Sequence, residues 1–336
     1  MKNITKVGLS ALAGALAITS VNAGEMSITG SMEASYTKGS GYLTTGNPLG
    51  MDKELSVTGS GELDDGTTVS YKQTITDAMA FNDSELVFGN VLGTTASVAM
   101  TSTGSPISAI DDVTPTAFEE ANALIGSIDD VNGMDGTYGI RVTMADVMGS
   151  GFKVDAMYTT AVGSGDAQAD NGTSGELGGT ADDGKEITIT GSVPMVEGLD
   201  VGLGYYTQDG KSAVTTGEYG QDEGTVYIKY STGPVSLGYQ KGAVANYTGG
   251  AEETQFTNNY YGISYKVSDS LSVSYNEMDT RKVVGGSDVE QDFDSISLSY
   301  TVGGMTIGVA DAEVSNAGYT SGRTADETSV SLSIAF

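Results

Sequence analysis

Seven acidic side chains gather in one segment, residues 102–136, which contains no lysine or arginine. They are Asp111, Asp112, Glu119, Glu120, Asp129, Asp130 and Asp135. Carboxylates at this density attract cations, and the end of the segment, from Asp130 to Asp135, partly matches a calcium-binding loop. The match lacks the EF-hand spacing and its closing glutamate. We therefore expect no cofactor, keep calcium as an alternative, and call residues 102–136 the acidic loop.

The rest of the composition excludes most catalytic chemistry. The chain has no Cys and no His, so a zinc site of the usual kind, a thiol nucleophile and a Ser-His-Asp triad are all ruled out. Its 44 acidic residues against 15 basic ones also argue against a nucleic-acid partner, because phosphate binding depends on Lys and Arg. We expect neither an enzyme nor a nucleic-acid-binding protein.

Residues 1–23 differ from the remainder of the chain. Lys2 and Lys6 precede an apolar run over residues 7–18, and small residues up to Ala23 follow. This order is typical of a signal peptide, so we expect cleavage after Ala23 and a single domain over residues 24–336. No later stretch approaches 18 continuous apolar residues. The mature chain is then either soluble outside the inner membrane or spans a membrane as a closed barrel.

Alternation of apolar and polar residues favours the barrel. From Met26 to Thr37 the two kinds of residue alternate strictly, and the same pattern recurs along the chain in runs of roughly 8 to 11 residues, enough for a tilted strand to cross a bilayer. The pattern predicts strands at residues 26–37, 53–63, 67–76, 83–89, 94–101, 137–144, 152–160, 185–193, 199–207, 223–230, 235–241, 258–267, 271–279, 292–302, 305–312 and 327–336.

The connections between these strands differ by side. Every second connection is short and turn-like, whereas the others are mostly long and polar, for example residues 161–184 and 280–291. This asymmetry is typical of outer-membrane barrels. We therefore predict an all-β protein, a transmembrane antiparallel β-barrel of about 16 strands.

Both ends of the mature chain support a more specific comparison. The opening residues 24–30, the closing residues 331–336, the strand number and the loop asymmetry together resemble the sixteen-stranded general-diffusion porins of Gram-negative bacteria. The resemblance implies export to the periplasm, insertion in the outer membrane as a multi-pass barrel, a homotrimer, and small hydrophilic solutes and ions as partners. It also implies that the terminal Phe336 is the signal for the outer-membrane assembly machinery.

The resemblance assigns the acidic loop a role. Its place between the fifth and sixth strands is where porins fold a loop inward to constrict the pore. Thr114-Pro115 before residues 117–124 predicts a short capped helix, and Phe118, Leu124 and Ile125 suit packing against the barrel wall. A solvated acidic surface loop is the alternative.

Strand parity predicts which charges face the channel, since outward positions must be apolar. The lumenal bases on this basis are Lys72, Arg141, Lys153, Lys229 and Lys266, and the lumenal acids are Glu33, Glu54, Glu62, Asp155, Glu186 and Asp200. In the porins that the chain resembles, a basic wall cluster faces the acidic loop, which here corresponds to Lys72, Arg141 and Lys153. The alternative is that these bases neutralise neighbouring acids.

The expected function is passive diffusion of small hydrophilic solutes through a cation-preferring channel. A low-dielectric wall around a narrow aqueous path strengthens the field of the excess acids on any ion that enters. Two other functions remain open. One is a substrate-specific outer-membrane channel, and the other is a secreted acidic calcium-binding adhesin.

Overall fold

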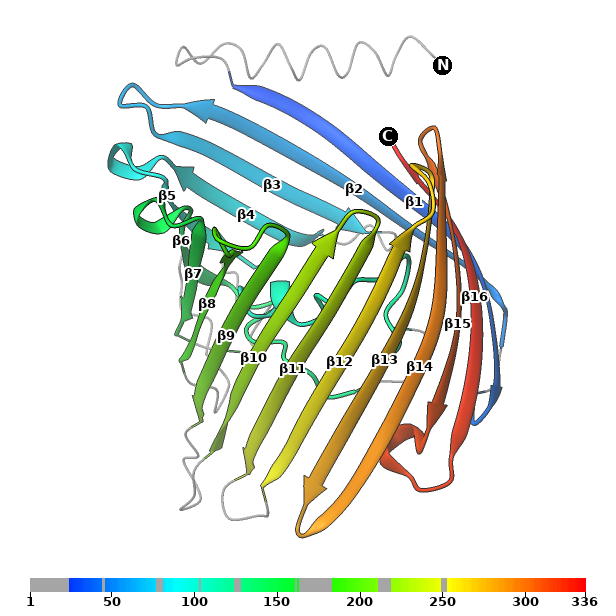
Figure 1. Cartoon of the computed structure of the whole chain (residues 1–336). Coiled ribbons are helices and arrows are strands. Elements are labelled where there is room, and N and C mark those ends of the chain that lie inside the picture. Colours follow the sequence, from blue (N-terminus) through cyan, green and yellow to red (C-terminus); the bar gives the residue numbers. More distant parts are fainter. Residues whose placement is uncertain are drawn as a thin grey trace.

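The computed structural model describes residues 24–43, 46–76, 81–102, 104–123, 128–160, 162, 183–210, 219–248 and 253–336. The predicted signal peptide lies outside these ranges. The described residues form a closed barrel of sixteen antiparallel strands (Figure 1). The predicted fold class is confirmed.

The strands follow the chain in order around the barrel, and each pairs with its sequence neighbours. They are β1 (Glu25–Gly41), β2 (Leu49–Glu62), β3 (Thr68–Thr76), β4 (Phe81–Gly89), β5 (Ala96–Thr101), β6 (Gly139–Met144), β7 (Phe152–Thr159), β8 (Gly184–Ser192), β9 (Leu199–Gly210), β10 (Tyr219–Thr232), β11 (Val235–Thr248), β12 (Thr254–Lys266), β13 (Leu271–Val284), β14 (Ser287–Val302), β15 (Met305–Ser315) and β16 (Thr324–Ala335).

Helical structure in the described ranges is limited to four single turns, η1 (Val91–Gly93), η2 (Ser108–Ile110), η3 (Val147–Gly149) and η4 (Ala317–Tyr319). In that part of the chain, no helix has the length and apolar character that crossing a membrane would require.

The two faces of the wall differ in chemistry, as the alternation predicts. Large apolar side chains such as Ile28, Leu203 and Ile296 remain exposed on the outer face. On the inner face, polar side chains such as Thr74 and Asn258 are buried. Because a lipid-facing surface must be apolar and a water-filled lumen must be polar, this distribution is that of a membrane barrel.

Several strands extend beyond the predicted limits at the end of the barrel that carries the long loops. Strand β11 was expected at residues 235–241 but continues to Thr248. The reason is that the outer face becomes polar there, with Asn259 on β12 and Asp279 on β13, while the backbone ladder continues. Hydrophobic alternation therefore ends before the strand does.

One predicted long loop is wrong. Residues 280–291 were expected to be a polar connection, but β13 and β14 pair up to Val284 and Ser287 and leave only Gly285 and Gly286 as the turn. Their φ values are 55° and 78°. A two-residue hairpin of type I′ needs positive φ at both positions, which Gly-Gly supplies without strain.

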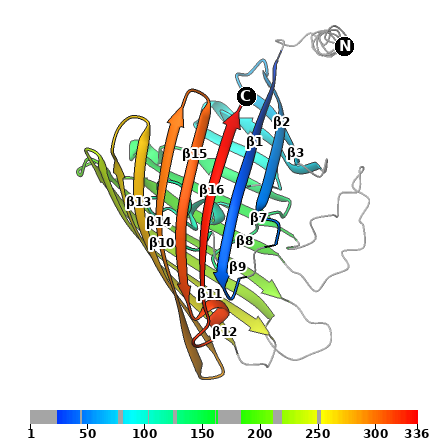
Figure 2. The same ribbon diagram turned by 90° about the vertical axis from the view of Figure 1, so that its right-hand side faces the viewer.

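The barrel closes where β1 meets β16. The register pairs Ser31 with Ala335, and the backbone of Gly30 exchanges hydrogen bonds of 2.8 and 2.9 Å with that of Phe336 (Figure 2). The ring of Phe336 lies over Gly30, where an added Cβ would be 2.7 Å from the ring. The Phe336 ring therefore occupies a space that only glycine at position 30 leaves free.

We predict that Gly30→Val lowers the yield of folded barrel several-fold, because its Cβ would collide with the Phe336 ring. Deletion of Phe336 should have the same effect, since it removes the last backbone pair of the closing seam. Heat-modifiable mobility on a denaturing gel measures the folded fraction. Gly59→Val on β2 is the matched control, because a Cβ there meets no atom within 4 Å. Equal yields for the Gly30 and Gly59 variants would contradict the prediction.

Candidate functional site

The acidic loop leaves the wall after β5 and runs across the inside of the barrel before β6. In both views of the barrel the described part of this segment lies within the ring of strands (Figures 1 and 2). Its contacts are with residues of the inner face, and they reach from β6, where Arg141 donates to the Gly104 carbonyl, to Gly308 on β15. A wide arc of the wall therefore holds the loop.

The first part of the loop is attached to β8 and β11. The Ser105 hydroxyl donates to the Glu186 carboxylate over 2.7 Å. The fully buried Gln240 side chain accepts from the Val113 amide over 2.8 Å and donates to the Ile110 carbonyl over 2.9 Å. A single side chain thus satisfies one backbone group at the end of η2 and one just after it, which fixes the position of Asp111 and Asp112 between them.

The central part of the loop is attached to β13 and β14 by hydroxyl groups. The amide of Ala117 donates to Ser274 Oγ over 2.9 Å, and the amide of Phe118 donates to Ser297 Oγ over 3.1 Å. Asn276 on β13 donates to the Pro115 carbonyl over 3.1 Å. These short polar side chains act as partners for backbone groups that would otherwise be unpaired inside the barrel.

Glycines on the inner face allow the loop to approach the wall closely. A Cβ at Gly308 on β15 would lie 2.4 Å from the Phe118 ring, and one at Gly238 on β11 would lie 2.3 Å from the Pro115 ring. Any larger residue at these two positions would push the loop away from the strands. Glycine in a strand here marks a site of close approach.

The returning part of the loop is held by carboxylate and amide groups. Glu223 on β10, only 2% exposed, accepts from the amides of Asn132 and Gly133 over 2.7 and 2.8 Å. Asn258 on β12 donates to the Asp129 carbonyl and to the Asp130 carboxylate, both over 3.0 Å. Apolar residues of the loop also enter two buried clusters, with Ala121 in one and Ile107, Val131 and Met134 in the other.

We predict that Gln240→Leu loosens the loop, because it leaves the Val113 amide and the Ile110 carbonyl without partners, at about 1–3 kcal/mol for each buried group. Hydrogen exchange of the Val113 amide should become faster, and single-channel current should become noisier. Gln255→Leu on the outer face of β12 is the control and should change neither quantity. Unchanged exchange at Val113 would show that Gln240 does not hold the loop.

The acidic side chains divide into two groups by exposure. Asp112, Asp129 and Asp135 are exposed, whereas Asp111, Glu119, Glu120 and Asp130 are half-buried. The charge of Asp112 acts on all four half-buried acids, so the structure brings five of the seven predicted carboxylates into one electrostatic cluster.

Burial and mutual repulsion raise the pKa values of the half-buried acids. Burial, together with the charge and hydrogen bond of Asp112, raises the pKa of Asp111 to about 8. Burial raises the pKa of Glu120 to about 7, with Asp112 adding to the effect. The pKa of Asp130 also rises to about 7 because of burial, although the hydrogen bond from Asn258 opposes the rise. The loop acids therefore change charge near neutral pH.

We predict that docking of the loop weakens as the pH rises. Between about pH 4 and its raised pKa of about 8, the Asp111 carboxyl group keeps its proton in the docked loop but loses it in an undocked loop. The free energy that favours docking therefore falls as the pH rises through this range. Hydrogen exchange at the Phe118 amide, corrected for intrinsic rates, measures this. Protection that stays constant or increases with pH would contradict the prediction.

Two of the three predicted wall bases, Arg141 and Lys153, pair with a wall acid. The Arg141 guanidinium makes a bidentate contact with Asp155, with 2.8 Å between Nε and Oδ1, and donates to the Gly104 carbonyl over 2.8 Å. Lys153 lies 3.4 Å from the same carboxylate. Lys72 on β3 is directly opposite Glu85 on β4 in the strand register. Among the described residues, no ion pair joins a wall base to an acid of the loop.

The opposite wall presents a further acid to the loop. Besides burial, the charge of Glu33 on β1 raises the pKa of Glu119. The Glu33 carboxylate accepts a hydrogen bond of 2.6 Å from Ser333 on β16. The field that a solute meets between the loop and this part of the wall is therefore acidic on both sides.

Two features of the loop differ from the sequence predictions or were missed by them. The described part of residues 117–124 forms no helix, since Ala117 and Phe118 donate their amides to wall hydroxyls instead of to a helical ladder. Glu223 was not predicted as a lumenal residue, although its strand parity identifies it as one. The predicted calcium site stays a prediction, and no group of three ligand side chains among the described residues is placed to hold a metal ion.

A closed barrel of sixteen antiparallel strands with an apolar outer face and a polar lumen is the fold of the Gram-negative outer-membrane porins. The chain is similar to the anion-selective porin from Comamonas acidovorans, with 15% identity, a TM-score of 0.65, and coverage of 93% of this chain and 100% of that one. It is also similar to OmpT, an outer membrane protein of Vibrio cholerae, with 11% identity, a TM-score of 0.64, and coverage of 95% and 99%.

A third similar structure is that of OmpF from Salmonella typhi in complex with daunomycin. It shows 12% identity, a TM-score of 0.59, and coverage of 93% of this chain and 97% of that one. Neither the protein-family models nor the curated proteins include a match. At these identities the likeness defines the fold, and the chemistry of the lumen must be argued from this chain's own residues.

Proposed function

We propose that this protein is an outer-membrane porin, a water-filled channel for passive diffusion of small hydrophilic solutes with a preference for cations. The observation that carries the proposal is the acidic loop itself, which is attached to the inner wall at Gln240, Ser297 and Glu223. A loop fixed in this way narrows the water path and holds its carboxylates beside whatever passes.

The preference for cations follows from how the charges are paired. Arg141 and Lys153 share one wall carboxylate, Asp155, which compensates half of their positive charge. The exposed carboxylate of Asp112 and the half-buried one of Glu119 have no such partner among the described residues. Negative potential therefore dominates the constriction.

The surroundings of the barrel belong to the same proposal. The apolar outer face fits outer-membrane lipid, and Phe336 at the closing seam fits a signal for the assembly machinery. We propose a homotrimer, which the trimer form of the similar OmpT of Vibrio cholerae supports by analogy. Export through the periplasm is part of the proposal, because a barrel of this kind reaches the outer membrane by that route.

Conductance of the purified protein in a planar bilayer tests the proposal. A reversal potential of the cation-preferring sign in a salt gradient is the expected result, and a complete lack of conductance would favour an adhesin instead. A substrate-specific channel would show conductance that one solute blocks at low concentration.

We predict that replacing Asp111, Asp112, Glu119 and Glu120 together by their amides lowers the cation-to-chloride permeability ratio by roughly tenfold at low salt, since potentials of several kT are involved. The effect should shrink near molar salt, where the Debye length is about 3 Å. Reversal potentials at two ionic strengths measure it.

The matched control removes four acids from the outer face of β13 and β14, namely Glu277, Asp279, Asp292 and Asp294. It should change the ratio little, because the wall separates these groups from the lumen. Arg141→Gln should raise cation preference, since Asp155 then loses its positive partner. Equal effects of the loop and outer-face variants would mean that the loop acids do not act on the conduction path.

A further inference from the structure

The connection between β15 and β16 also folds onto the inner face, at the long-loop end of the barrel. The Gly318 amide donates to the Gln291 side chain, and the Tyr319 hydroxyl is hydrogen-bonded to Thr280. The Asn316 side chain donates to the Glu290 carbonyl over 3.0 Å. Three wall residues thus hold this short connection in place over β13 and β14.

The backbone of the connection is strained at an aromatic residue. Asn316 and Tyr319 have φ values of 53° and 54°, in the left-handed region. Asparagine tolerates this region, but a bulky aromatic side chain rarely adopts it. Strain of this kind persists where surrounding contacts enforce it, and it is concentrated at ligand-binding positions. Here it directs the Tyr319 ring to within 5.8 Å of the Phe256 ring, centroid to centroid.

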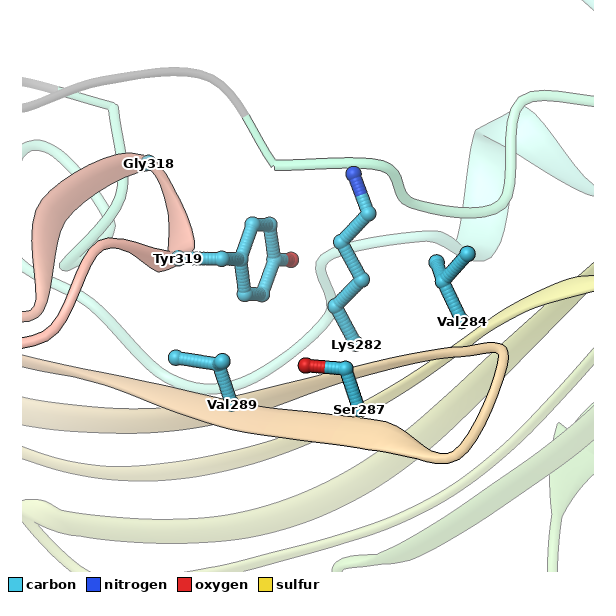
Figure 3. A pocket seen from close by; sticks show the side chains of 6 residues that line it. All are labelled: Lys282, Val284, Ser287, Val289, Gly318 and Tyr319. Carbon is cyan, nitrogen blue, oxygen red and sulfur yellow. The ribbon is translucent and has the colours of Figure 1, made fainter.

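A pocket of about 220 Å³ lies between this connection and the β13–β14 hairpin (Figure 3). It is lined by Lys282, Val284, Ser287, Val289, Gly318 and Tyr319. The volume would hold roughly seven water molecules. One wall is apolar, and the ammonium group of Lys282 and the hydroxyls of Ser287 and Tyr319 supply the polar groups, which is the usual composition of a small-molecule site.

Lys282 brings a positive charge to the pocket. Its Nζ lies 5.2 Å from the centre of the Phe256 ring and 5.5 Å from that of the Tyr319 ring. Among the described residues, no carboxylate lies within ion-pair distance of this ammonium group. The neighbouring Arg281 pairs with Asp288 on the opposite face of the hairpin. Lys282 is therefore available to an incoming carboxylate.

Carboxylates of the acidic loop act on Tyr319, which lines the pocket. The Asn258 side chain donates a hydrogen bond of 3.0 Å to the Asp129 carbonyl. In the strand register Asn258 is directly opposite Thr280, whose hydroxyl is hydrogen-bonded to that of Tyr319. Lys282 is two residues further along β13 than Thr280, about 7 Å at the usual rise of a strand. The charges of Asp129 and Asp130 act on the Tyr319 phenol, whose pKa burial already raises.

We propose that this pocket captures small zwitterions with an apolar side chain, of the kind represented by an apolar α-amino acid. Lys282 pairs with the carboxylate, Asp129 pairs with the ammonium group, and Val284 and Val289 cover the apolar side chain. A simple anion is disfavoured by the acidic loop, and a simple cation is disfavoured by Lys282. The inference rests on the proposed channel function and deepens it, because it names a class of solute that binds at the long-loop end of the channel.

Calorimetric titration of the purified protein in detergent tests the inference with three probes. They are L-leucine, 4-methylpentanoate, which lacks the ammonium group, and 3-methylbutylamine, which lacks the carboxylate. Leucine should bind at least about tenfold more tightly than either analogue, because each analogue loses one charge-assisted contact. Equal affinity of leucine and 4-methylpentanoate would overturn the zwitterion assignment.

Two variants with matched controls test which side chains bind the carboxylate and the ammonium group of leucine. Lys282→Gln should weaken leucine binding about tenfold, whereas Lys229→Gln, on the inner face opposite Asp200, should leave it unchanged. Asp129→Asn should weaken leucine but not 4-methylpentanoate, a coupling that a general loss of structure would not produce. Asp135→Asn is its control. Equal losses in a variant and its control would overturn the assignment.

The titration does not depend on conduction, so the two proposals fail separately. Leucine binding that follows these rules in a protein without conductance would contradict the channel function alone. A conducting, cation-preferring channel that binds leucine no better than its two analogues would contradict the capture site alone. The variant Tyr319→Gly is a second test of the pocket, because it removes the aromatic ring and the backbone strain together. It should weaken leucine binding without abolishing the barrel.

Discussion

A wall that spans a membrane must pair every backbone N–H and C=O group within the protein, because lipid offers no partner. Closure of β1 on β16 fulfils this condition, and the Gly30–Phe336 pair completes the seam. Once the ladder is closed, side chains can only alternate between lipid and lumen. The lipid-facing half of the strand residues must then be apolar. The chemistry of the channel therefore depends on the lumen-facing half and on the acidic loop inside the barrel.

The same constraint applies again to the loop inside the barrel. Packed against the wall, its backbone groups lose part of their access to water and need partners there. Ser274, Ser297, Asn276 and Gln240 provide them with hydroxyl and amide groups, which add no net charge. Because these neutral groups satisfy much of the loop backbone, they leave the carboxylates of Asp112, Asp129 and Asp135 exposed to the solution.

The strands were predictable from the sequence, whereas the position of the acidic loop on the inner wall was not. Period-two alternation is local, so sixteen strands and their faces follow from neighbouring residues. The contact of Ser297 with the Phe118 amide joins residues 179 positions apart, and no local pattern reports it. The helix expected at 117–124 is wrong for the same reason, since wall hydroxyls compete for its amides. Parity predicts that Arg141 and Asp155 both face the lumen, but it does not predict that they pair with each other.

Counting acids in the sequence overstates the charge that a solute meets. Glu186 and Glu223 accept hydrogen bonds from the loop, and Asp155 is matched to a guanidinium group, so these carboxylates serve the structure as much as the field. Asp111 and Glu120 lose charge near neutral pH because of burial. The lumen therefore holds a smaller and pH-dependent negative charge, concentrated on the exposed edge of the loop. The field at the constriction therefore comes from that exposed edge and from Glu33 on β1, whose charge acts on Glu119.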